Sequence, residues 1–458
     1  MSETALTCLA EFVAENALTP DQATTAILRD GVIDTLGCMI VGAKTDVAQR
    51  SYSAAVHMGG YGGPSRVVGS SECFSRPHAA FLNAVAGHAL DFDDWEIPGN
   101  THPTVVLLPA LLAVAERRNS GQDLVQAYLA GFEVIARLGE ALNFEHYDAG
   151  WHSTATLGAI GAAAGCARLM GLNPSETARA MSLACSSAAG YTCQFGSNAK
   201  PVQAGFAARA GVEAACLAKA GLSAQIHVLD HPSGLAALMG GLNADRLEQV
   251  LRKIGTSYAL GEHGLVLKPW PSCGYTHRLM TCALAMRARI HAKEISQVIL
   301  HMPDFHAAVL PFGRPKSRAE ALFSAPFVVS MGLLEGDLTL ADLDSEAWKH
   351  PAVSELISRC ELRPFSPKRP DLNYSPDDPD RIEVILQTGE RIDECCVFPI
   401  GAREVPMSGR SVMAKFKANL GRMSEANTRR AVWMAKLQDW PSVSSVLDLF
   451  FEEGLPHE

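Results

Sequence analysis

The chain has 458 residues, of which 48% are hydrophobic and 19% are charged. This composition excludes a disordered chain, and the length is too great for one compact core, so we expect two domains. The 39 basic and 49 acidic residues give a net charge of −10, which argues against a surface for nucleic acid or for an anionic membrane. Cations gathered inside a pocket would still allow the protein to bind an acidic substrate.

The sequence also indicates the cellular compartment of the protein. Its first residues lack the basic and then apolar pattern of a secretory signal, and it has no uncharged apolar run of about 18 residues that would predict a transmembrane helix. The 12 cysteines are scattered, without the paired spacing of a metal site. We therefore expect a cytoplasmic protein with reduced thiols and no membrane partner.

The first part of the chain has the apolar spacing of helices. Residues 4–43 predict two helices and residues 44–57 a third, and the glycine-rich segment 58–64 is interpreted as a turn. Residues 75–77 open a further helix, which we expect to extend over 79–94. The later helices are rich in small residues, which favour close packing near the centre of the fold. They are predicted at 109–118, 121–143, 154–170, 174–189, 199–220 and 244–254.

The pattern changes after about residue 290. Residues 295–302 alternate between apolar and polar and predict a strand, and residues 382–397 predict a hairpin around a turn at 388–390. Residues 360–365 predict a third strand, which Pro364 confines to an edge or an end of a sheet. Helices are expected at 318–335, 340–345 and within 408–458. The fold class is therefore mainly α, with a large all-α domain over residues 1–267 and a smaller α+β domain over residues 268–399.

Residues 87–95 concentrate acidic and imidazole side chains in an otherwise apolar region. If residues 79–94 are helical, His88, Asp91 and Asp94 share roughly one face. His102 follows in the loop after the helix is broken at 98–99. Such a cluster indicates a site rather than a solvated surface, and its spacing alone also suits a metal.

Three other segments carry groups that are able to react. Residues 146–154 contain Tyr147 and His152 just before a helix start, which suits an anion but equally a capped helix with half-buried aromatic rings. Lys200 lies at a turn before an apolar helix, where a solvated loop is the plain alternative. Residues 268–278 combine a lysine, a thiol, a phenol, an imidazole and a guanidinium near the expected domain junction, which favours a functional role.

These segments together resemble the MmgE/PrpD family in order and spacing, over nearly the whole chain. The family includes 2-methylcitrate dehydratase, cis-aconitate decarboxylase and iminodisuccinate epimerase. The resemblance is carried by residues 88–94, 102–103, 150–152, 198–201 and 268–273, with further matches at 34–37 and 323–326.

The resemblance implies a fold and a kind of chemistry. It implies a homodimer, and a helical domain that is completed by the chain from about residue 400 to residue 458. It also implies a reaction at a carbon next to a carboxylate of a di- or tricarboxylate, without a metal or an organic cofactor. Such a carbon is a poor acid, so the site must stabilise the negative charge that develops in the transition state.

The resemblance also implies roles for individual residues. Lys200 and Lys268 match the pocket lysines that neutralise the substrate, and Lys268 is expected among the catalytic groups. Proton transfer is assigned to His102 and His152, whose imidazoles have pKa values suited to neutral pH. Tyr147 is expected as a second acid.

The other candidates are expected to bind or orient. Asp91 and Asp94 would repel a dianion unless paired, so we expect them to orient imidazoles or lysines. Ser272, Cys273 and His277 are expected to contact the substrate, with Ser272 and Cys273 packing or hydrogen bonding rather than acting as nucleophiles.

The leading hypothesis is a cofactor-free lyase similar to 2-methylcitrate dehydratase. The alternatives are an epimerase that removes and returns an α-proton, a cis-aconitate-type decarboxylase, and a helical binding protein that has lost the chemistry. Phe327 stands where family members often have a tyrosine, and the missing hydroxyl weakens the decarboxylase alternative.

Overall fold

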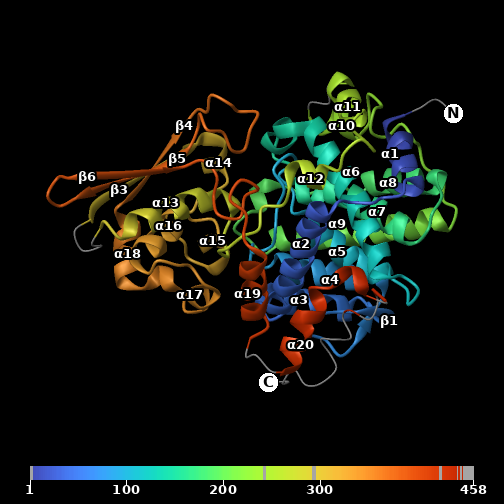
Figure 1. Cartoon of the computed structure of the whole chain (residues 1–458), viewed down its shortest axis with the longest axis horizontal. Coiled ribbons are helices and arrows are strands. Elements are labelled where there is room, and N and C mark those ends of the chain that lie inside the picture. The colour runs from blue at the N-terminus through green and yellow to red at the C-terminus, as the bar shows by residue number, and fades with distance from the viewer. Residues whose placement is uncertain are drawn as a thin grey trace.

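The computed structural model describes residues 4–240, 244–290, 295–421, 425–440, 442–443 and 446. The chain is mainly helical, and its larger sheet lies at one end of the elongated molecule (Figure 1). The helices up to residue 263 are α1 (Ala5–Glu15), α2 (Gln22–Gly42), α3 (Asp46–His57), α4 (Arg76–His88), α5 (Pro103–Val114), α6 (Gly121–Asp148), α7 (Ser153–Leu169), α8 (Pro174–Cys185), α9 (Ala199–Lys219), α10 (Leu235–Leu238), α11 (Ala244–Leu251) and α12 (Ala259–His263).

The later helices and the sheet follow. The helices are α13 (His277–Arg287), α14 (Asp304–Ala308), α15 (Arg318–Ala321), α16 (Ala325–Leu334), α17 (Leu340–Asp344), α18 (Pro351–Ser358), α19 (Gly409–Asn419) and α20 (Glu425–Met434). The strands of the larger sheet are β3 (Ile295–Pro303), β4 (Cys360–Phe365), β5 (Asp380–Leu386) and β6 (Arg391–Cys396), in the order β4-β3-β5-β6.

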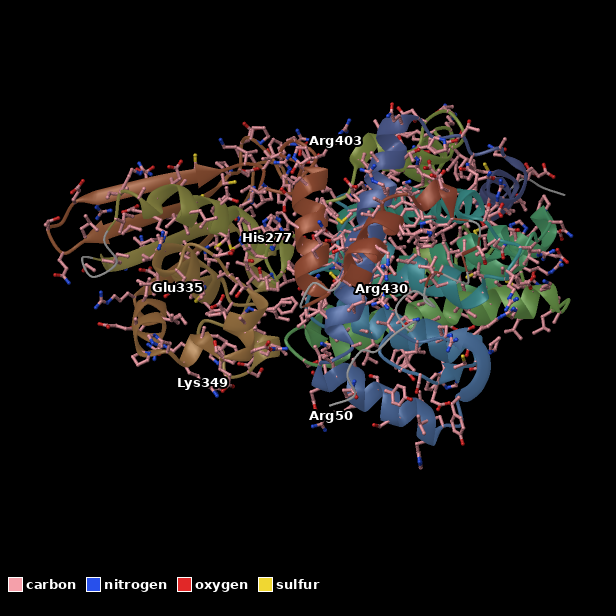
Figure 2. All side chains as sticks on the ribbon, turned by 60° about the horizontal axis from the view of Figure 1, so that its bottom comes forward. Arg50, His277, Glu335, Lys349, Arg403 and Arg430 are labelled. Atoms are coloured by element: carbon pink, nitrogen blue, oxygen red, sulfur yellow. The ribbon has the colours of Figure 1, made fainter. Side chains whose placement is uncertain are left out.

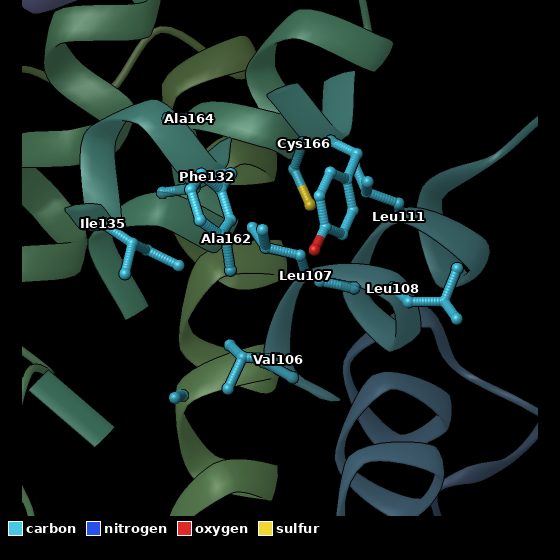
Figure 3. Close-up of a cluster of buried hydrophobic side chains, with 14 of the residues drawn as sticks. Val106, Leu107, Leu108, Leu111, Phe132, Ile135, Ala162, Ala164 and Cys166 are labelled. Carbon is cyan, nitrogen blue, oxygen red and sulfur yellow. The ribbon is translucent and has the colours of Figure 1, made fainter. Parts of the chain in front are cut away.

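Helices α4, α5, α6, α7 and α9 pack on one another at the centre of the helical part. Small residues bring their backbones close together, as the sequence predicts. A Cβ on Gly161 of α7 would lie 2.7 Å from the carbonyl oxygen of Gly131 on α6. Figure 3 shows the large apolar side chains that fill the space beside these contacts, among them Val106, Leu107 and Phe132.

The larger sheet contains the strands that the sequence predicts, and the strand with Pro364 lies at its edge as predicted. Strands β5 and β6 form the predicted antiparallel hairpin, and β3 pairs antiparallel with β5. Strand β4 pairs parallel with β3 and lies at the edge of the sheet, where Pro364 costs fewer hydrogen bonds. Helix α13 packs on β5 and β6, and α16 packs on α13, so the sheet is anchored beside the segment that precedes His277.

Two helix predictions and one turn prediction are corrected. Helix α4 ends at His88 rather than continuing to residue 94, and Asp91 has a positive φ of 47°. Residues 58–64 are not only a turn, because Tyr61–Arg66 forms a strand, β1, that pairs with β2 (Cys73–Phe74). The helix expected over 318–335 is interrupted between α15 and α16, where Ser324 caps the second helix.

The buried apolar side chains form two large clusters. One draws on residues from Ala5 to Leu267 and on the end of the chain, including Phe416 of α19. The other lies in residues from Val266 to Ala402, together with Trp95. The division into domains at residues 267 and 268 stays a prediction, but the chain after residue 400 does return to the first cluster.

Helix α19 also reaches the segment that follows α4. Its Lys415 ammonium group donates to the backbone carbonyl of Phe92 at 2.6 Å and lies 2.8 Å from a carboxylate oxygen of Asp34 on α2. Helix α19 therefore anchors the segment that carries Asp91, Asp93 and Asp94.

Candidate active site

A small cavity, open on one side, lies between residues of the helical part and the segment before α13. In Figure 2, His277 marks this junction between the sheet end and the helical end of the molecule. The cavity is lined by Asp91, Trp95, Asn100, His102, Tyr147, His152, Phe195, Lys200, Cys273, Gly274, Tyr275 and Phe323.

Three helix N-termini bring functional side chains to the cavity. His102 is the N-cap residue of α5, His152 is the N-cap residue of α7, and Lys200 lies in the first turn of α9. Unpaired backbone N–H groups and the helix dipole give such ends a partial positive charge. Three of them around one cavity favour an anion and disfavour protonated imidazoles.

Asp91 lies between the two predicted lysines. Its Oδ1 accepts from the Lys200 ammonium at 2.9 Å and from the Lys268 ammonium at 2.7 Å, and Lys268 also donates to the Asp91 backbone carbonyl at 2.9 Å. Burial alone would raise the pKa of Asp91, but Lys200 and then Lys268 hold it well below its usual range. Asp91 is therefore a carboxylate that keeps both ammonium groups in place.

His102 is oriented by acceptors on one side of its ring. Its Nδ1 lies 2.8 Å from the backbone carbonyl of Asp94 and 3.1 Å from the Asp93 carboxylate. Because both neighbours accept, Nδ1 carries the proton of the neutral ring, and Nε2 is left bare, 3.7 Å from Asp91 Oδ1. Burial lowers the pKa of His102 to about 3, so the ring is neutral at pH 7.

His152 is held in a similar way. Its Nδ1 lies 2.6 Å from Gln203 Oε1, and the Gln203 amide nitrogen donates to the Tyr191 carbonyl at 3.2 Å, which fixes the amide orientation. Nδ1 therefore carries the proton, and the buried Nε2 has no partner among the described residues. Burial, and then the charge of Lys200, lower the pKa of His152 well below its usual value. The cavity thus has two neutral imidazoles with bare Nε2 atoms.

Asp93 is the orienting carboxylate that the sequence did not single out. It accepts from His88 Nδ1 at 2.9 Å and lies beside His102, and the two imidazole rings are 4.5 Å apart. Burial would raise the pKa of Asp93, but His88 and His102 hold it well below its usual value. The sequence predicts that this helix extends to residue 94, which would place Asp94, rather than Asp93, on the face shared with His88. In the structure, α4 ends at His88.

Comparison with known proteins decides the family. The sequence model of the MmgE/PrpD N-terminal domain matches residues 7–247, and that of the MmgE/PrpD C-terminal domain matches residues 270–439. The chain belongs to the MmgE/PrpD family. Cis-aconitate decarboxylase of Homo sapiens is 30% identical to this MmgE/PrpD protein over 420 residues, covering 87% of this chain and 83% of the human protein.

Two further relatives of this MmgE/PrpD protein are also cis-aconitate decarboxylases. Cis-aconitate decarboxylase of Mus musculus is 29% identical over 412 residues, which cover 86% of this chain and 81% of the mouse protein. That of Aspergillus terreus is 25% identical over 419 residues, with 86% and 84% covered.

Three residues expected to bind substrate do not line the cavity. The Asp94 carboxylate is buried and accepts from the Thr104 hydroxyl on α5, so Asp94 acts on His102 through its backbone carbonyl. The Ser272 hydroxyl pairs with Thr276 at 2.9 Å. His277 is buried with its ring 5.2 Å from that of Trp270. These positions support the cavity wall of the MmgE/PrpD fold from outside.

Three other predicted site residues lie at or beside the cavity: Lys268, Tyr147 and Cys273. Lys268 is fully buried beneath the lining and meets the cavity through Asp91. Tyr147 comes from the end of α6, and burial raises the pKa of its phenol well above the usual value, so it is protonated. Burial raises the pKa of the Cys273 thiol to about 11, which agrees with a packing or hydrogen-bonding role rather than a nucleophilic one.

One group of lining and neighbouring residues has the ligand types of a metal site. Ligand atoms of His88, Asp91, Asp93 and His102 lie within 4.8 Å of one another. Lys200 and Lys268 both contact Asp91, however, and two ammonium groups at one carboxylate repel a further cation. The imidazole Nδ1 atoms are also committed to Asp93.

Removing divalent metals should therefore leave the activity of this MmgE/PrpD protein intact. We expect kcat/KM to stay within about twofold after dialysis against a strong chelator, since the cations in and beneath the cavity are lysines. The measurement is the rate before dialysis, after it, and after adding back zinc or magnesium. A loss that either metal restores would contradict this expectation.

Stability should fall as the pH drops from 7 to 5. Burial lowers the pKa of His102 and His277 to about 3 and that of His146 to about 4, from an ordinary value of 6.5. Below pH 6.5 the unfolded chain binds protons that the folded chain does not, so each such histidine removes up to about 1.4 kcal/mol per pH unit. Calorimetric Tm values at pH 7 and pH 5 test this, and a Tm that does not fall would contradict it.

Proposed function

We propose that this protein is a cofactor-independent carboxy-lyase that acts on a tricarboxylate of the cis-aconitate kind. The observation that carries the proposal is one cavity lined by Lys200 and two neutral imidazoles, with Lys268 just beneath it and both lysines held by Asp91. The names of the relatives support a decarboxylase among the family's reactions. They give no support to the dehydration that the sequence led us to expect first.

The lysines supply the charge stabilisation. When the bond between carbon and the departing carboxylate breaks, its electron pair stays on a carbon conjugated with a second carboxylate, and CO₂ leaves. Two ammonium groups beside that carboxylate stabilise the developing charge. At an effective dielectric constant near 20, each contact at about 4 Å is worth about 4 kcal/mol before desolvation. Lys200 and Lys268 are already positioned by Asp91, so little reorganisation is needed.

A proton must then reach the carbon. Decarboxylation consumes one proton, so an imidazole must be protonated in the complex although it is neutral in the free cavity. The substrate itself provides the reason, since its carboxylates are negative charges that raise the pKa of a nearby imidazole. His102 is the proposed donor because its Nε2 faces the cavity and its Nδ1 already donates to Asp94 and Asp93.

The missing hydroxyl at Phe327 does not count against decarboxylation. Phe327 is fully buried on α16, and its ring packs edge to face on Trp348, with centroids 5.9 Å apart. It is not a lining residue, whereas Tyr147 and Tyr275 are. The phenols available to the cavity are therefore supplied from other elements.

The reaction is tested by incubating the protein with cis-aconitate in deuterated water. We expect stoichiometric release of CO₂ and one non-exchanging deuterium in the product. Parallel incubations with 2-methylcitrate and with iminodisuccinate test dehydration and epimerisation. If no substrate releases CO₂, dehydration of 2-methylcitrate would favour the dehydratase instead. In the same case, α-deuteration of iminodisuccinate would favour the epimerase. Binding without any turnover would favour the helical binding protein.

The homodimer and the cytoplasmic location stay predictions. Light scattering at several protein concentrations tests the first, with a mass of twice 48.9 kDa expected. Within the described part of the chain, every helix is too short or too polar to cross a bilayer.

A further inference from the structure

The residues around the cavity fall into two groups by their mutual contacts. In one, the Lys200 ammonium lies 5.3 Å from the Phe195 ring centroid and 5.2 Å from that of Phe323. In the other, Trp95 lies against Gly274 and against the ring of Tyr275. The first group holds the cationic end that the proposed reaction uses, and the second has no assigned role.

Trp95 offers a hydrogen-bond donor with no partner. Its side chain is 5% exposed, and its indole Nε1 has no acceptor within the part of the chain that the structure describes. The residue is fixed, because its backbone exchanges two hydrogen bonds with Val266, at 3.1 and 2.8 Å. A buried N–H without an acceptor costs free energy unless a ligand pairs with it.

Gly274 lies directly against that donor. A Cβ at this position would lie 2.8 Å from Trp95 Nε1 and 2.9 Å from Cε2 of the same ring. Both residues line the cavity, and a side chain at 274 would press on the indole N–H there. The glycine thus leaves room beside the donor.

Asn100 offers a second donor next to Tyr275. The Asn373 amide nitrogen donates to the Ile97 carbonyl at 2.8 Å and to Asn100 Oδ1 at 2.6 Å. The Ile97 carbonyl can only accept, so the Asn373 atom is the nitrogen and the facing Asn100 atom is the oxygen. The Tyr275 hydroxyl lies 3.1 Å from the same oxygen. The amide nitrogen of Asn100 is therefore directed away from this network.

The loop around Asn100 is held in place. The Glu96 carboxylate accepts from the backbone N–H groups of Gly99 at 3.0 Å and Thr101 at 3.2 Å. Between them Asn100 has a φ of 54°, a left-handed conformation that asparagine tolerates better than most residues. The amide is thus presented by a clamped loop rather than by a mobile one.

We propose that Trp95 Nε1 and Asn100 Nδ2 form an uncharged subsite for a second carboxylate of the substrate. One carboxylate lies at Lys200 and Lys268, and another accepts from the indole and the amide. This inference rests on the proposed function for the first carboxylate and extends it to the choice of substrate. The subsite selects molecules with at least two carboxylates and rejects monocarboxylates.

The test uses tricarballylate, a saturated tricarboxylate that cannot be turned over, and butyrate as a monocarboxylate. The variants are Trp95→Phe, which removes the N–H, Asn100→Asp, which keeps the oxygen that Tyr275 and Asn373 contact, and Gly274→Ala. We expect each to weaken tricarballylate binding about tenfold or more, because a hydrogen bond to a charged group is lost. Butyrate affinity should stay within about twofold.

Trp270→Phe is the matched control. Its indole also donates, to Asp337 at 3.1 Å, but Trp270 is not a lining residue. We expect it to leave both affinities unchanged. Equal weakening of both probes in the three variants, unchanged tricarballylate binding, or no preference for tricarballylate in the parent protein would each overturn the subsite. Tricarballylate does not react, so a negative CO₂ assay would contradict the reaction without affecting this result.

Discussion

Replacing Lys268 by methionine should lower kcat/KM for the carboxylate substrate by about a thousandfold. The ammonium group is fully buried and contacts Asp91 Oδ1 at 2.7 Å and the Asp91 backbone carbonyl at 2.9 Å. Lys268→Met keeps the aliphatic stem and removes the charge. A stabilisation of about 4 kcal/mol that acts on the transition state corresponds to about three powers of ten in rate.

The same substitution should also destabilise the fold. Breaking a buried ion pair by removing one partner costs about 3–5 kcal/mol, and Lys200, which still contacts Asp91 at 2.9 Å, should reduce that cost. Activity must therefore be measured well below the Tm of the variant. The sequence places Lys268 in a loop just before two prolines, and only the structure shows that Lys268 is buried.

Lys415→Met is the control for a general effect on folding. Lys415 is also buried and also donates to a backbone carbonyl and approaches a carboxylate, but it lies outside the cavity. We expect a comparable fall in Tm and less than about a tenfold change in kcat/KM. Equal kinetic losses in the two variants would show that Lys268 acts only by holding the fold.

Replacing His102 by glutamine should lower kcat by about 10²–10⁴-fold, the usual contribution of a general acid or base. Glutamine keeps a donor for the Asp94 carbonyl but cannot carry a proton to carbon. The control is His146→Gln, which changes a buried histidine that bonds to Thr156 and does not line the cavity. We expect it to change the Tm more than kcat.

The pH dependence separates a proton donor from a merely positioned ring. In the protein without substrate, the pKa of His102 is about 3, so His102 is unprotonated at neutral pH. The reactive complex therefore contains one proton more than the free enzyme and the ionised substrate together. In the parent protein kcat/KM should therefore fall about tenfold per pH unit as the pH rises from 7 to 9. In His102→Gln this slope should disappear. A slope that survives the substitution would assign the proton to another group.

The sequence predicts the candidate reacting groups better than the residues that hold them in place. Lys200, Lys268, His102 and His152 are carried by short segments whose residue types reveal their chemistry, and all four lie in or just beneath one cavity. Of the two aspartates expected to orient other groups, Asp91 contacts both lysines, whereas the carboxylate beside His102 is that of Asp93 and not that of Asp94. No glycine or proline separates Asp91 from the end of α4, so periodicity extends the helix, whereas contacts to two distant lysines turn the chain at φ 47°.

The other differences have the same physical origin. Strand β1 contains no alternating apolar pattern and forms only because Cys73–Phe74 pairs with it. Trp95 and Gly274 lie in segments that the sequence singles out for other residues, and Asn100 lies just after one of them. Their position at one cavity depends on a loop, a strand-like bridge and a turn that are distant in sequence. Local propensity cannot report such contacts, because each is set by the tertiary fold.

The bond from Lys415 to the Phe92 carbonyl has a consequence for synthesis on the ribosome. Its partners are 323 residues apart, so the segment that carries Asp91 and Asp93 leaves the ribosome long before its last support has been made. At about 5–20 residues per second, that interval is on the order of tens of seconds. Both lysines that contact Asp91 are also made after it, first Lys200 and later Lys268. The nascent chain should thus lack this support of its acidic segment until α19 has been made.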